Sequence, residues 1–480
     1  MPNTEKRTVR VAVCTGPISG PPLLSLGSFD LAALGYVVEE FFLSGDAVSY
    51  RPGGEHGDDG MWVAEPDGLS PYTTRIVVVR PADAARFNGS VAVEWLNVSA
   101  GTDGAPDWSM THRELIRSGY AYVGVSAQKA GLDGNGAFGA LPGVLPVRQA
   151  DPQRYGALSH PGDAFSFDIY TQTGEAVRGK GGASLLGGLV PRRVLALGES
   201  QSAAFLTTYH NAVAPISEVF DGFLIHSRFR AAVPLDGRYV PSSKAAAPVA
   251  VKLRGDLAKP VLVVITETDL MLRGAGFLPA RQPDSDHLRI WEIAGTAHAD
   301  TYVLNASAID SGSAAILDLV AAYAPTASIM GMPLGKPMNS APQHHYVVMA
   351  ALSALDTWVE TGKRPAQATP LETTLSTPPQ LVLDKHGNAM GGVRSPWMDT
   401  PLVRLSGLGQ TGPIELAVLF GVTEAFDHET LDTLYPNGLS DYLRGFGSSL
   451  ESAVALGFIL PADKSDIMSL AAASYPVRMD

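Results

Sequence analysis

Up to about residue 300, short runs of apolar residues alternate along the chain with longer segments of helical periodicity. A run of four to eight apolar residues between turn residues is typical of a buried strand, whereas apolar positions every three or four residues indicate one face of a helix. Such alternation predicts a largely parallel sheet with helices on both faces. We expect strands at 36–43, 74–80, 90–96, 120–126, 193–197, 222–226, 261–266 and 288–293.

The pattern also predicts the helices and a change of texture along the chain. Helices are expected at 107–118 with Asp107 as N-cap, 165–177, 202–212, 314–323, 347–360, near 414–420 and at 449–458. After 314–323 comes a Pro, Gly and Met-rich stretch, and from about residue 366 the chain becomes rich in Pro and Thr. We therefore expect a core at 1–365 with a lid insert at about 299–342. Residues 366–480 are expected to form an extension that packs on the core or caps it.

One strand runs directly into Gly198-Glu199-Ser200-Gln201-Ser202, and an apolar helical segment follows. A serine hydroxyl is a poor nucleophile unless a base takes its proton. The pattern Gly-x-Ser-x-Gly at a sharp strand-to-helix turn holds such a serine clear of its backbone. Here Ser202 replaces the last glycine and is small enough to let strand and helix approach. The alternative is that Ser200 only caps the helix, but its context favours a nucleophile.

An acid and a histidine follow Ser200 in the order that this kind of site requires. The strand at 261–266 opens into Glu267-Thr268-Asp269, and the strand at 288–293 opens into a loop that contains His298. Each group follows a strand end, where ligands sit in sheets of this class. We expect His298 to be the general base. Asp269 lies the usual few residues past its strand and is preferred as the acid, with Glu267 as the open alternative.

Other residues near these strand ends have candidate roles. The backbone N–H of Gln201 and one from the loop after the strand at 90–96, at Val98 or Ser99, are expected to bind a developing oxyanion. In the same loop Asn97 is a candidate for substrate contact. The pair His344-His345 is a rival to His298, but it opens a helix, so we expect packing or, for His344, substrate contact. His226 is expected to be a satisfied histidine near the core.

Several segments resemble one known family in order and spacing. They are Glu94-Trp95-Leu96-Asn97-Val98-Ser99, Gly124-Val125-Ser126-Ala127-Gln128, His160-Pro161-Gly162-Asp163, Thr266-Glu267-Thr268-Asp269 and Ala294-Gly295-Thr296-Ala297-His298-Ala299-Asp300, with Pro342-Gln343-His344 and Gly387-Asn388-Ala389 further on. Together with the Gly-Glu-Ser-Gln-Ser turn they resemble the bacterial and fungal α/β-hydrolase-domain proteins. The resemblance implies the α/β-hydrolase fold and an esterase-like serine hydrolase. It implies no particular substrate, because this fold hosts many activities.

Composition and charge narrow the function further. A net charge of −13 without clustered Lys and Arg argues against a nucleic-acid partner. The single cysteine, Cys14, excludes an intrachain disulfide. The polar N-terminus and the lack of any run of about 20 apolar residues predict no membrane span and a cytoplasmic protein. We expect a small-molecule ester as substrate, while the oligomeric state stays open.

No cofactor or metal is expected. Residues 134–139 read Gly-x-Gly-x-x-Gly, but they stand several residues after the nearest strand and lead into Ala-Leu-Pro-Gly, which cannot open the helix that a dinucleotide site needs. His298-Ala299-Asp300 and His344-His345 lack the spacing that places two metal ligands on one helix face. A catalytically inactive binding protein of the same fold, or a lactonase or amidase with the same triad, are the alternatives to an esterase.

Overall fold

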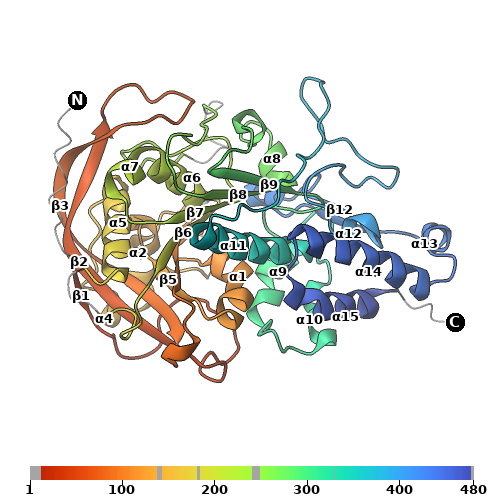
Figure 1. The fold of residues 1–480 in the computed structure, drawn as a ribbon, viewed down its shortest axis with the longest axis horizontal. Helices are drawn as coiled ribbons and strands as arrows, with labels where there is room; N and C mark the ends of the chain where they lie inside the picture. Colours follow the sequence, from red (N-terminus) through yellow and green to blue (C-terminus); the bar gives the residue numbers. More distant parts are fainter. Residues whose placement is uncertain (1–11, 138–142, 181–183, 241–248, 330, 477–480) are drawn as a thin grey trace.

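A nine-stranded sheet runs through the computed structural model, which describes residues 12–137, 143–180, 184–240, 249–329 and 331–476 (Figure 1). The spatial order of its strands is β1-β2-β3-β5-β4-β6-β7-β8-β9. The strands are β1 (Val13–Thr15), β2 (Tyr36–Pro52), β3 (Ala64–Pro81), β4 (Ser90–Trp95), β5 (Ala121–Val125), β6 (Arg193–Glu199), β7 (Gly222–His226), β8 (Val261–Thr266) and β9 (Leu288–Ile293).

The first strands pair antiparallel and the rest pair parallel. β1, β2, β3 and β5 are antiparallel neighbours, whereas β5, β4, β6, β7, β8 and β9 form one parallel series. Parallel strands need crossover connections, so their carboxyl ends all lie at one edge of the sheet. This mostly parallel sheet with covering helices is the α/β-hydrolase fold, and the predicted fold class is confirmed.

The α-helices connect and cover the strands. They are α1 (Pro106–Arg117), α2 (Lys129–Asp133), α3 (Val147–Ala150), α4 (Pro152–Tyr155), α5 (Ser166–Val177), α6 (Gln201–Thr208), α7 (Ala214–Ser217), α8 (Glu267–Met271), α9 (Thr301–Leu304), α10 (Ile316–Tyr323), α11 (Gln343–Thr361), α12 (Pro396–Asp399), α13 (His428–Leu434), α14 (Leu439–Leu456) and α15 (Lys464–Ser474). A π-helical turn, η3 (Tyr209–Val213), extends α6. Short 3₁₀ turns are η1 (Ala84–Arg86), η2 (Asp163–Phe165), η4 (Leu278–Ala280), η5 (Ala306–Ala308), η6 (Glu415–Leu419) and η7 (Pro461–Asp463).

Two hydrophobic cores lie on opposite faces of the sheet, because successive side chains of a strand point to opposite sides. In β6, Val194 and Ala196 pack into the core beneath α5 and α6. Leu195 and Leu197 pack into the core beneath α1 and α11. Every residue of β6 is buried, which explains why the parallel strands read as continuous apolar runs rather than as alternating ones.

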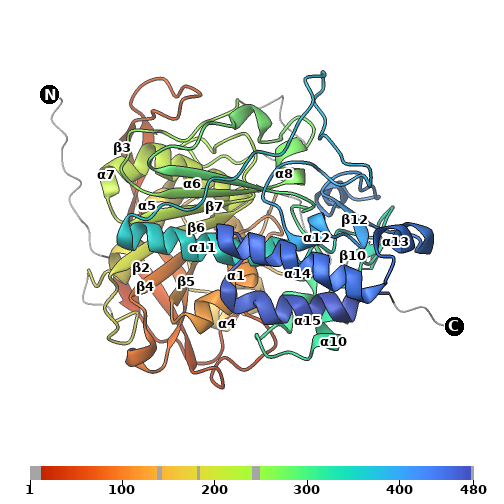
Figure 2. The ribbon, with the colours of Figure 1, turned by 45° about the vertical axis from the view of Figure 1, so that its right-hand side comes forward.

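The segment after α11 packs on the core. A third hydrophobic cluster joins Tyr346 and Met349 of α11 to Phe446 and Leu450 of α14, and α14 and α15 lie beside α11 and α10 (Figure 2). In the region predicted as a lid, a small hairpin of β10 (Ser328–Ile329) and β11 (Met332–Pro333) packs on the chain around η6. The C-terminal segment also pairs β12 (Val403–Ser406) with β13 (Val422–Ala425). The lid role stays a prediction.

Some element boundaries differ from the sequence prediction. The predicted N-cap role of Asp107 is wrong: Ala105 is the N-cap of α1 and Asp107 is the second helical residue. The Glu94 carboxylate of β4 accepts the N–H groups of Asp107 and Trp108 instead, at 2.9 Å each. α11 begins at Gln343, before the predicted start at 347. Its first turn is wholly buried, and this hides the amphipathic pattern there. Near 414–420 the chain forms only η6, and the helix expected at 449–458 begins at 439.

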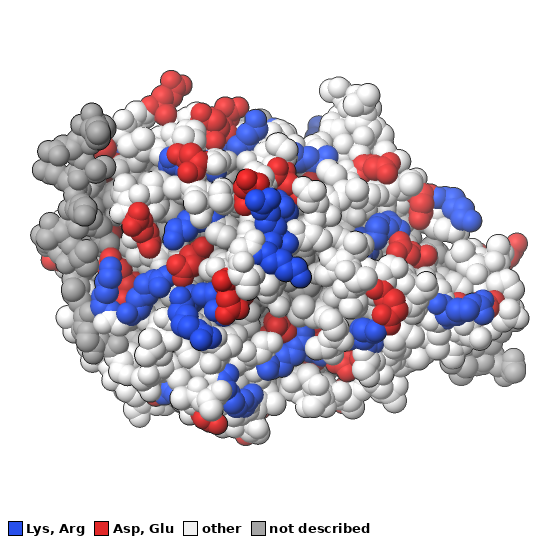
Figure 3. All heavy atoms as spheres, viewed as in Figure 1, with Lys and Arg blue, Asp and Glu red and all other residues white. Residues whose placement is uncertain are grey.

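The charge on the surface and the apolar character of the helices can be compared with what a nucleic acid or a membrane requires. Acidic and basic side chains are interspersed over the face drawn in Figure 3, so this face offers no continuous basic surface to a nucleic acid. In the described ranges, no helix combines the length and the apolar character needed to cross a membrane.

Arg75, on the antiparallel side of the sheet, is the centre of a buried group of charged side chains. Its fully buried guanidinium lies 2.9 Å from Asp103 and 3.2 Å from Glu40. Removing one member of such a group leaves uncompensated buried charge. We expect Arg75→Met to lower the free energy of unfolding by about 3–5 kcal/mol, measured by urea denaturation. Arg51→Met, which breaks an exposed ion pair with Glu65, is the control, with an expected loss below about 1 kcal/mol. Equal losses would contradict this account.

Candidate active site

Ser200 occupies a sharp turn between β6 and α6. Its backbone has φ 60° and ψ −115°, a strained conformation for a residue with a side chain. One hydrogen bond holds the turn: the Ser200 N–H donates to the carbonyl of His226 at 3.0 Å. The strand and helix also approach closely, because a Cβ on Gly198 would lie only 3.1 Å from the backbone of Ser202. A side chain at 198 would therefore crowd the start of α6. The turn presents Ser200 at the carboxyl edge of the parallel strands.

His298 and Asp269 form a buried pair at the same edge. The His298 Nδ1 lies 2.6 Å from Asp269 Oδ1, and the ring stacks on Phe229 with 5.2 Å between centroids. A capping box at the start of α8 orients the acid, because the Thr266 N–H donates to Asp269 Oδ2 at 2.8 Å. Burial acts to raise the pKa of Asp269, but His298 and the hydrogen bonds from Thr266 outweigh it and lower that pKa below its usual value. Asp269 is therefore ionised at neutral pH.

Glu267 turns away from the histidine. Its carboxylate accepts the N–H groups of Gly295 at 2.6 Å and Gly407 at 2.8 Å, and the Ser406 hydroxyl at 3.3 Å. Burial raises the pKa of Glu267 to about 7. Of the two acids that the sequence left open, the structure brings only Asp269 against His298. Glu267 instead ties the loop after β9 to the C-terminal segment.

The other nitrogen of His298 faces a second carboxylate that the sequence analysis missed. The His298 Nε2 lies 3.4 Å from Glu199 Oε1. Among the described residues, no hydrogen bond joins the Ser200 hydroxyl to His298. Burial raises the pKa of Glu199 to about 7. Burial alone would lower the pKa of His298, but Asp269 and then Glu199 raise it above its usual value. The only sequence signal for Glu199 was its place inside the serine motif.

The loop after β4 reaches the same turn. The Asn97 Nδ2 donates to Glu199 Oε2 at 3.1 Å and to the Glu199 carbonyl at 3.2 Å, and its Oδ1 accepts the Ser99 N–H at 2.8 Å. The Ser99 N–H is thus already engaged, while that of Val98 has no partner within the described ranges. Gln201 begins α6, so its N–H has no acceptor in the helix. Asn97 serves to hold Glu199, and both of its amide N–H groups are engaged in doing so, so neither is left to donate to a substrate.

His344 and His226 lie behind the serine turn rather than in a cleft. His344 is fully buried, with its Nδ1 2.9 Å from Asp300 and its Nε2 3.1 Å from the Nε2 of His226. The predicted substrate contact of His344 disagrees with this arrangement, because neither ring nitrogen is free. His226 is buried and hydrogen-bonded, as a satisfied core histidine would be.

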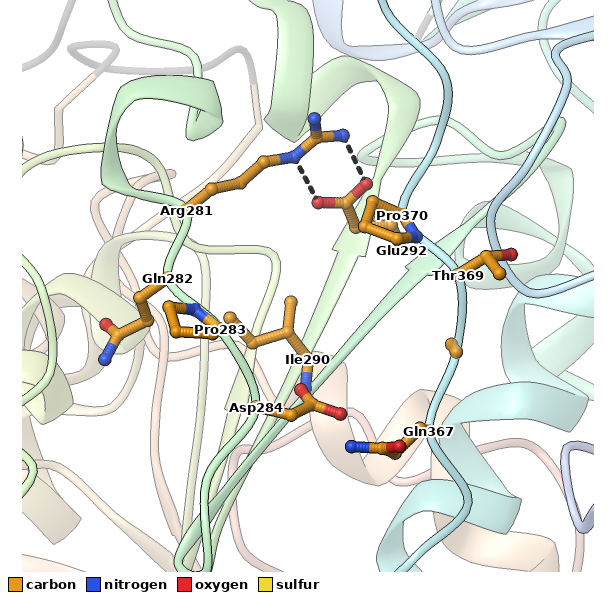
Figure 4. A pocket seen from close by; sticks show the side chains of 10 residues that line it. Arg281, Gln282, Pro283, Asp284, Ile290, Glu292, Gln367, Thr369 and Pro370 are labelled. Atoms are coloured by element: carbon orange, nitrogen blue, oxygen red, sulfur yellow. Dashed lines mark hydrogen bonds and ion pairs between the residues drawn. The ribbon is translucent and has the colours of Figure 1, made fainter.

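A surface pocket of about 670 Å³ lies elsewhere, beside the edge strand β9 (Figure 4). An ion pair between Arg281 and Glu292, at 2.6 Å, crosses it. Because Ser200, Asp269 and His298 are absent from its lining, its volume says nothing about their substrate. Within the described residues no group of three His, Cys, Asp or Glu could hold a metal ion. Gly139, the last glycine of the dinucleotide-like stretch, lies outside the described residues.

Comparisons with solved structures find distant likenesses. A putative dienelactone hydrolase from Klebsiella pneumoniae subsp. pneumoniae is 12% identical, with 56% of this chain and 95% of that chain covered and a TM-score of 0.28. Fungal esterases from Rhizomucor miehei are 11% identical, with 70% of this chain and 93% of that chain covered and a TM-score of 0.31. An α/β serine hydrolase from Xanthomonas campestris is 13% identical, with 52% of this chain and 86% of that chain covered and a TM-score of 0.26. No curated protein matches the chain.

A family model gives the broadest match. The model described as "Alpha/beta hydrolase domain" matches residues 4–469, nearly the whole chain. Its match agrees with the sheet order and with the predicted resemblance. The chain therefore belongs to the α/β hydrolase domain family.

Proposed function

We propose that the protein is a serine hydrolase that cleaves carboxylic esters of small molecules through an acyl-enzyme intermediate. The observation that carries this proposal is the hydrogen bond between Asp269 and His298 beside the strained turn that holds Ser200. A serine, a histidine and an acid in these roles are the components that acyl transfer requires. The family supports a hydrolase but names no substrate, because the fold alone does not determine function.

The proposed chemistry begins with a proton transfer. The Nε2 of His298 takes the proton of the Ser200 hydroxyl, and the oxygen attacks the ester carbonyl carbon. The N–H groups of Gln201 and Val98 bind the resulting oxyanion; Ser99 would first have to release Asn97. The alkoxide leaves with the proton from His298. Water then attacks the acyl-enzyme, with His298 again as base, and the carboxylic acid is released.

Asp269 has two roles in this scheme. Its carboxylate fixes the tautomer in which His298 carries a proton on Nδ1, so that Nε2 is free to accept one. It also stabilises the imidazolium that forms in both steps. Because Thr266 holds the other carboxylate oxygen, the acid does not rotate away when the charge on the ring changes.

A panel of p-nitrophenyl esters with acyl chains of increasing length tests the activity. We expect the purified protein to release p-nitrophenol, with kcat/KM highest for one range of acyl length. Ser200→Ala is measured beside it, because a background from a contaminating esterase would persist in that variant. Absence of turnover on every ester in the panel would contradict the proposal.

Glu199 predicts the pH dependence. His298 acts as a base only when neutral, and the Glu199 carboxylate favours its protonated form. Replacing that carboxylate with a neutral amide lowers the pKa of His298, so we expect Glu199→Gln to move the acid limb of kcat/KM to lower pH by about one unit. The measurement is a pH–rate profile, with the exposed Glu55→Gln as control. An unchanged limb in Glu199→Gln, or an equal shift in the control, would count against this contact.

A further inference from the structure

Four buried groups form one hydrogen-bonded chain behind the serine turn. Asp107 Oδ1 lies 2.9 Å from His226 Nδ1. His226 Nε2 lies 3.1 Å from His344 Nε2, and His344 Nδ1 lies 2.9 Å from Asp300 Oδ2. All four residues are at most 1% exposed. The chain therefore runs carboxyl, imidazole, imidazole, carboxyl, without access to solvent.

The number of protons in this chain follows from its geometry. Each of its three hydrogen bonds needs one proton between its two heavy atoms. With only two protons, one pair of lone pairs would face each other at hydrogen-bond distance, which is costly in a buried site. With three protons every contact is satisfied, and the two carboxyl groups and two imidazoles together carry one negative charge.

The surroundings decide at which end that charge rests. Asp300 Oδ1 accepts the N–H of Val303 at 3.1 Å as the N-cap of α9, which favours an ionised group. Asp107 Oδ2 has no hydrogen-bond partner among the described residues. At the start of α1 the Glu94 carboxyl accepts the helix N–H groups of Asp107 and Trp108. Burial and then the neighbouring Asp107 raise the pKa of Glu94 well above its usual value, so these two adjacent carboxyls do not both carry a charge. Burial raises the pKa of Asp107 to about 8, in agreement with a protonated acid.

We propose that Asp107, His226, His344 and Asp300 form a positioning relay with three protons, in which Asp107 is neutral and Asp300 is ionised. Asp107 donates to His226 Nδ1, His226 donates from Nε2 to His344, and His344 donates from Nδ1 to Asp300. The two histidines are neutral and are opposite tautomers. Burial, and then the neighbouring His344, lower the pKa of His226 to about 3, so it does not take up a further proton.

The relay connects the two parts of the site that must meet. The carbonyl of His226 accepts the N–H of Ser200, and Asp300 lies two residues after His298 in the same loop. Through His226 of β7, the relay thus holds the serine turn between β6 and α6 at a fixed distance from the histidine loop, with α1 and α11 as its anchors. The ionisable groups Glu199, Asp269 and His298 act on His226 from the site side, and Glu94 faces Asp107 from β4.

The proton arrangement is measurable without any activity. In protein labelled with ¹⁵N-histidine, multiple-bond ¹H–¹⁵N spectra separate the two neutral tautomers from the cation. We expect His226 as the Nε2–H tautomer and His344 as the Nδ1–H tautomer at about pH 6.5, where a free imidazole would be half protonated, with assignment from His226→Gln and His344→Gln. The same tautomer in both rings, or an imidazolium signal from either ring at that pH, would overturn the relay.

Matched variants test its direction and its role. Asp107→Asn keeps a donor for His226, so we expect it to keep both tautomers, whereas Asp300→Asn removes the charge and should change them. Loss of both tautomers in Asp107→Asn would overturn the direction. The positioning role rests on the proposed function: we expect His344→Leu to lower kcat by about tenfold or more with KM unchanged, and the exposed His428→Leu to change neither. An unchanged kcat in a folded His344→Leu would overturn it.

The two proposals fail in different ways. If Ser200 is not the nucleophile, the spectra of the wild-type protein still report the relay. If His344→Leu does not fold, the tautomers of the wild type still decide whether the relay exists. A chain with opposite neutral tautomers in an enzyme that is unaffected by Ser200→Ala would leave the relay standing and remove the proposed function.

Discussion

Ser200→Ala is expected to abolish labelling by a fluorophosphonate probe and to lower kcat for p-nitrophenyl esters by about 10⁴-fold or more. The proposed mechanism requires a covalent bond to the Ser200 oxygen, and alanine offers no atom for that bond. We also expect the thermal stability of Ser200→Ala to change only slightly. Serine and alanine both carry a Cβ, so both experience the same strain in the backbone conformation at position 200. Labelling followed by mass spectrometry of the modified peptide, with steady-state kinetics, gives both readouts.

Ser202→Ala is the matched control for this prediction. Ser202 lies in the same motif, but its side chain is fully buried and its hydroxyl has no hydrogen-bond partner among the described residues. We expect full labelling and a thermal midpoint that is unchanged or slightly raised, because an unsatisfied buried hydroxyl is removed. Equal labelling of Ser200→Ala and the wild type would show that Ser200 is not the nucleophile.

Asp269→Asn is expected to lower kcat by about 10³- to 10⁴-fold while the protein remains folded. The amide is the same size as the carboxylate, but it does not stabilise an imidazolium and it allows the wrong histidine tautomer. The loss should appear mainly in kcat, because the acid does not touch substrate in the proposed mechanism. Steady-state kinetics at a pH above the acid limb separate this loss from a shift in the pKa of His298.

Glu267→Gln is the variant to compare with Asp269→Asn, because the structure gives the two acids different partners. Glu267 accepts three hydrogen bonds from the loops at Gly295 and 406–407, and a glutamine would place N–H groups against some of these donors. We therefore expect a lower thermal midpoint but a much smaller loss of kcat than in Asp269→Asn. A larger kcat loss in Glu267→Gln would assign the acid role to Glu267 instead.

The structure adds a second carboxylate, Glu199, beside the histidine of the proposed triad. His298 lies between Asp269 on Nδ1 and Glu199 on Nε2, so its imidazolium is favoured from both nitrogens. The contact with Glu199, rather than with Ser200, also means that the ring must exchange one partner for the other when catalysis begins. Catalytic hydrogen bonds are often long or misaligned before substrate binds. The pH profile of Glu199→Gln tests the Glu199 contact from which this exchange would begin.

The amino-acid pattern alone predicted the parallel strands, from β6 to β9 almost to the residue. These strands are buried on both faces, so their sequences are continuous apolar runs that end where the chain leaves the sheet. The same local logic located Ser200, Asp269 and His298, because each follows a strand end in a fixed order. Such features depend on neighbours within a few residues, and a sequence displays them directly.

What the pattern left open depends on groups far apart in the chain. Glu267 and Asp269 are equivalent as letters, and only the capping box of α8 and the Gly407 N–H decide which of them faces His298. The relay joins Asp107, His226, His344 and Asp300 from four separate elements. Its existence depends on the packing of α1 and α11 on one face of the sheet. The strand ends, and with them the candidate serine and histidine and the two candidate acids, were determined by the sequence itself. Which acid faces His298, and the partners of the other groups, were decided by tertiary structure, because side-chain direction and burial are set by contacts that no local pattern contains.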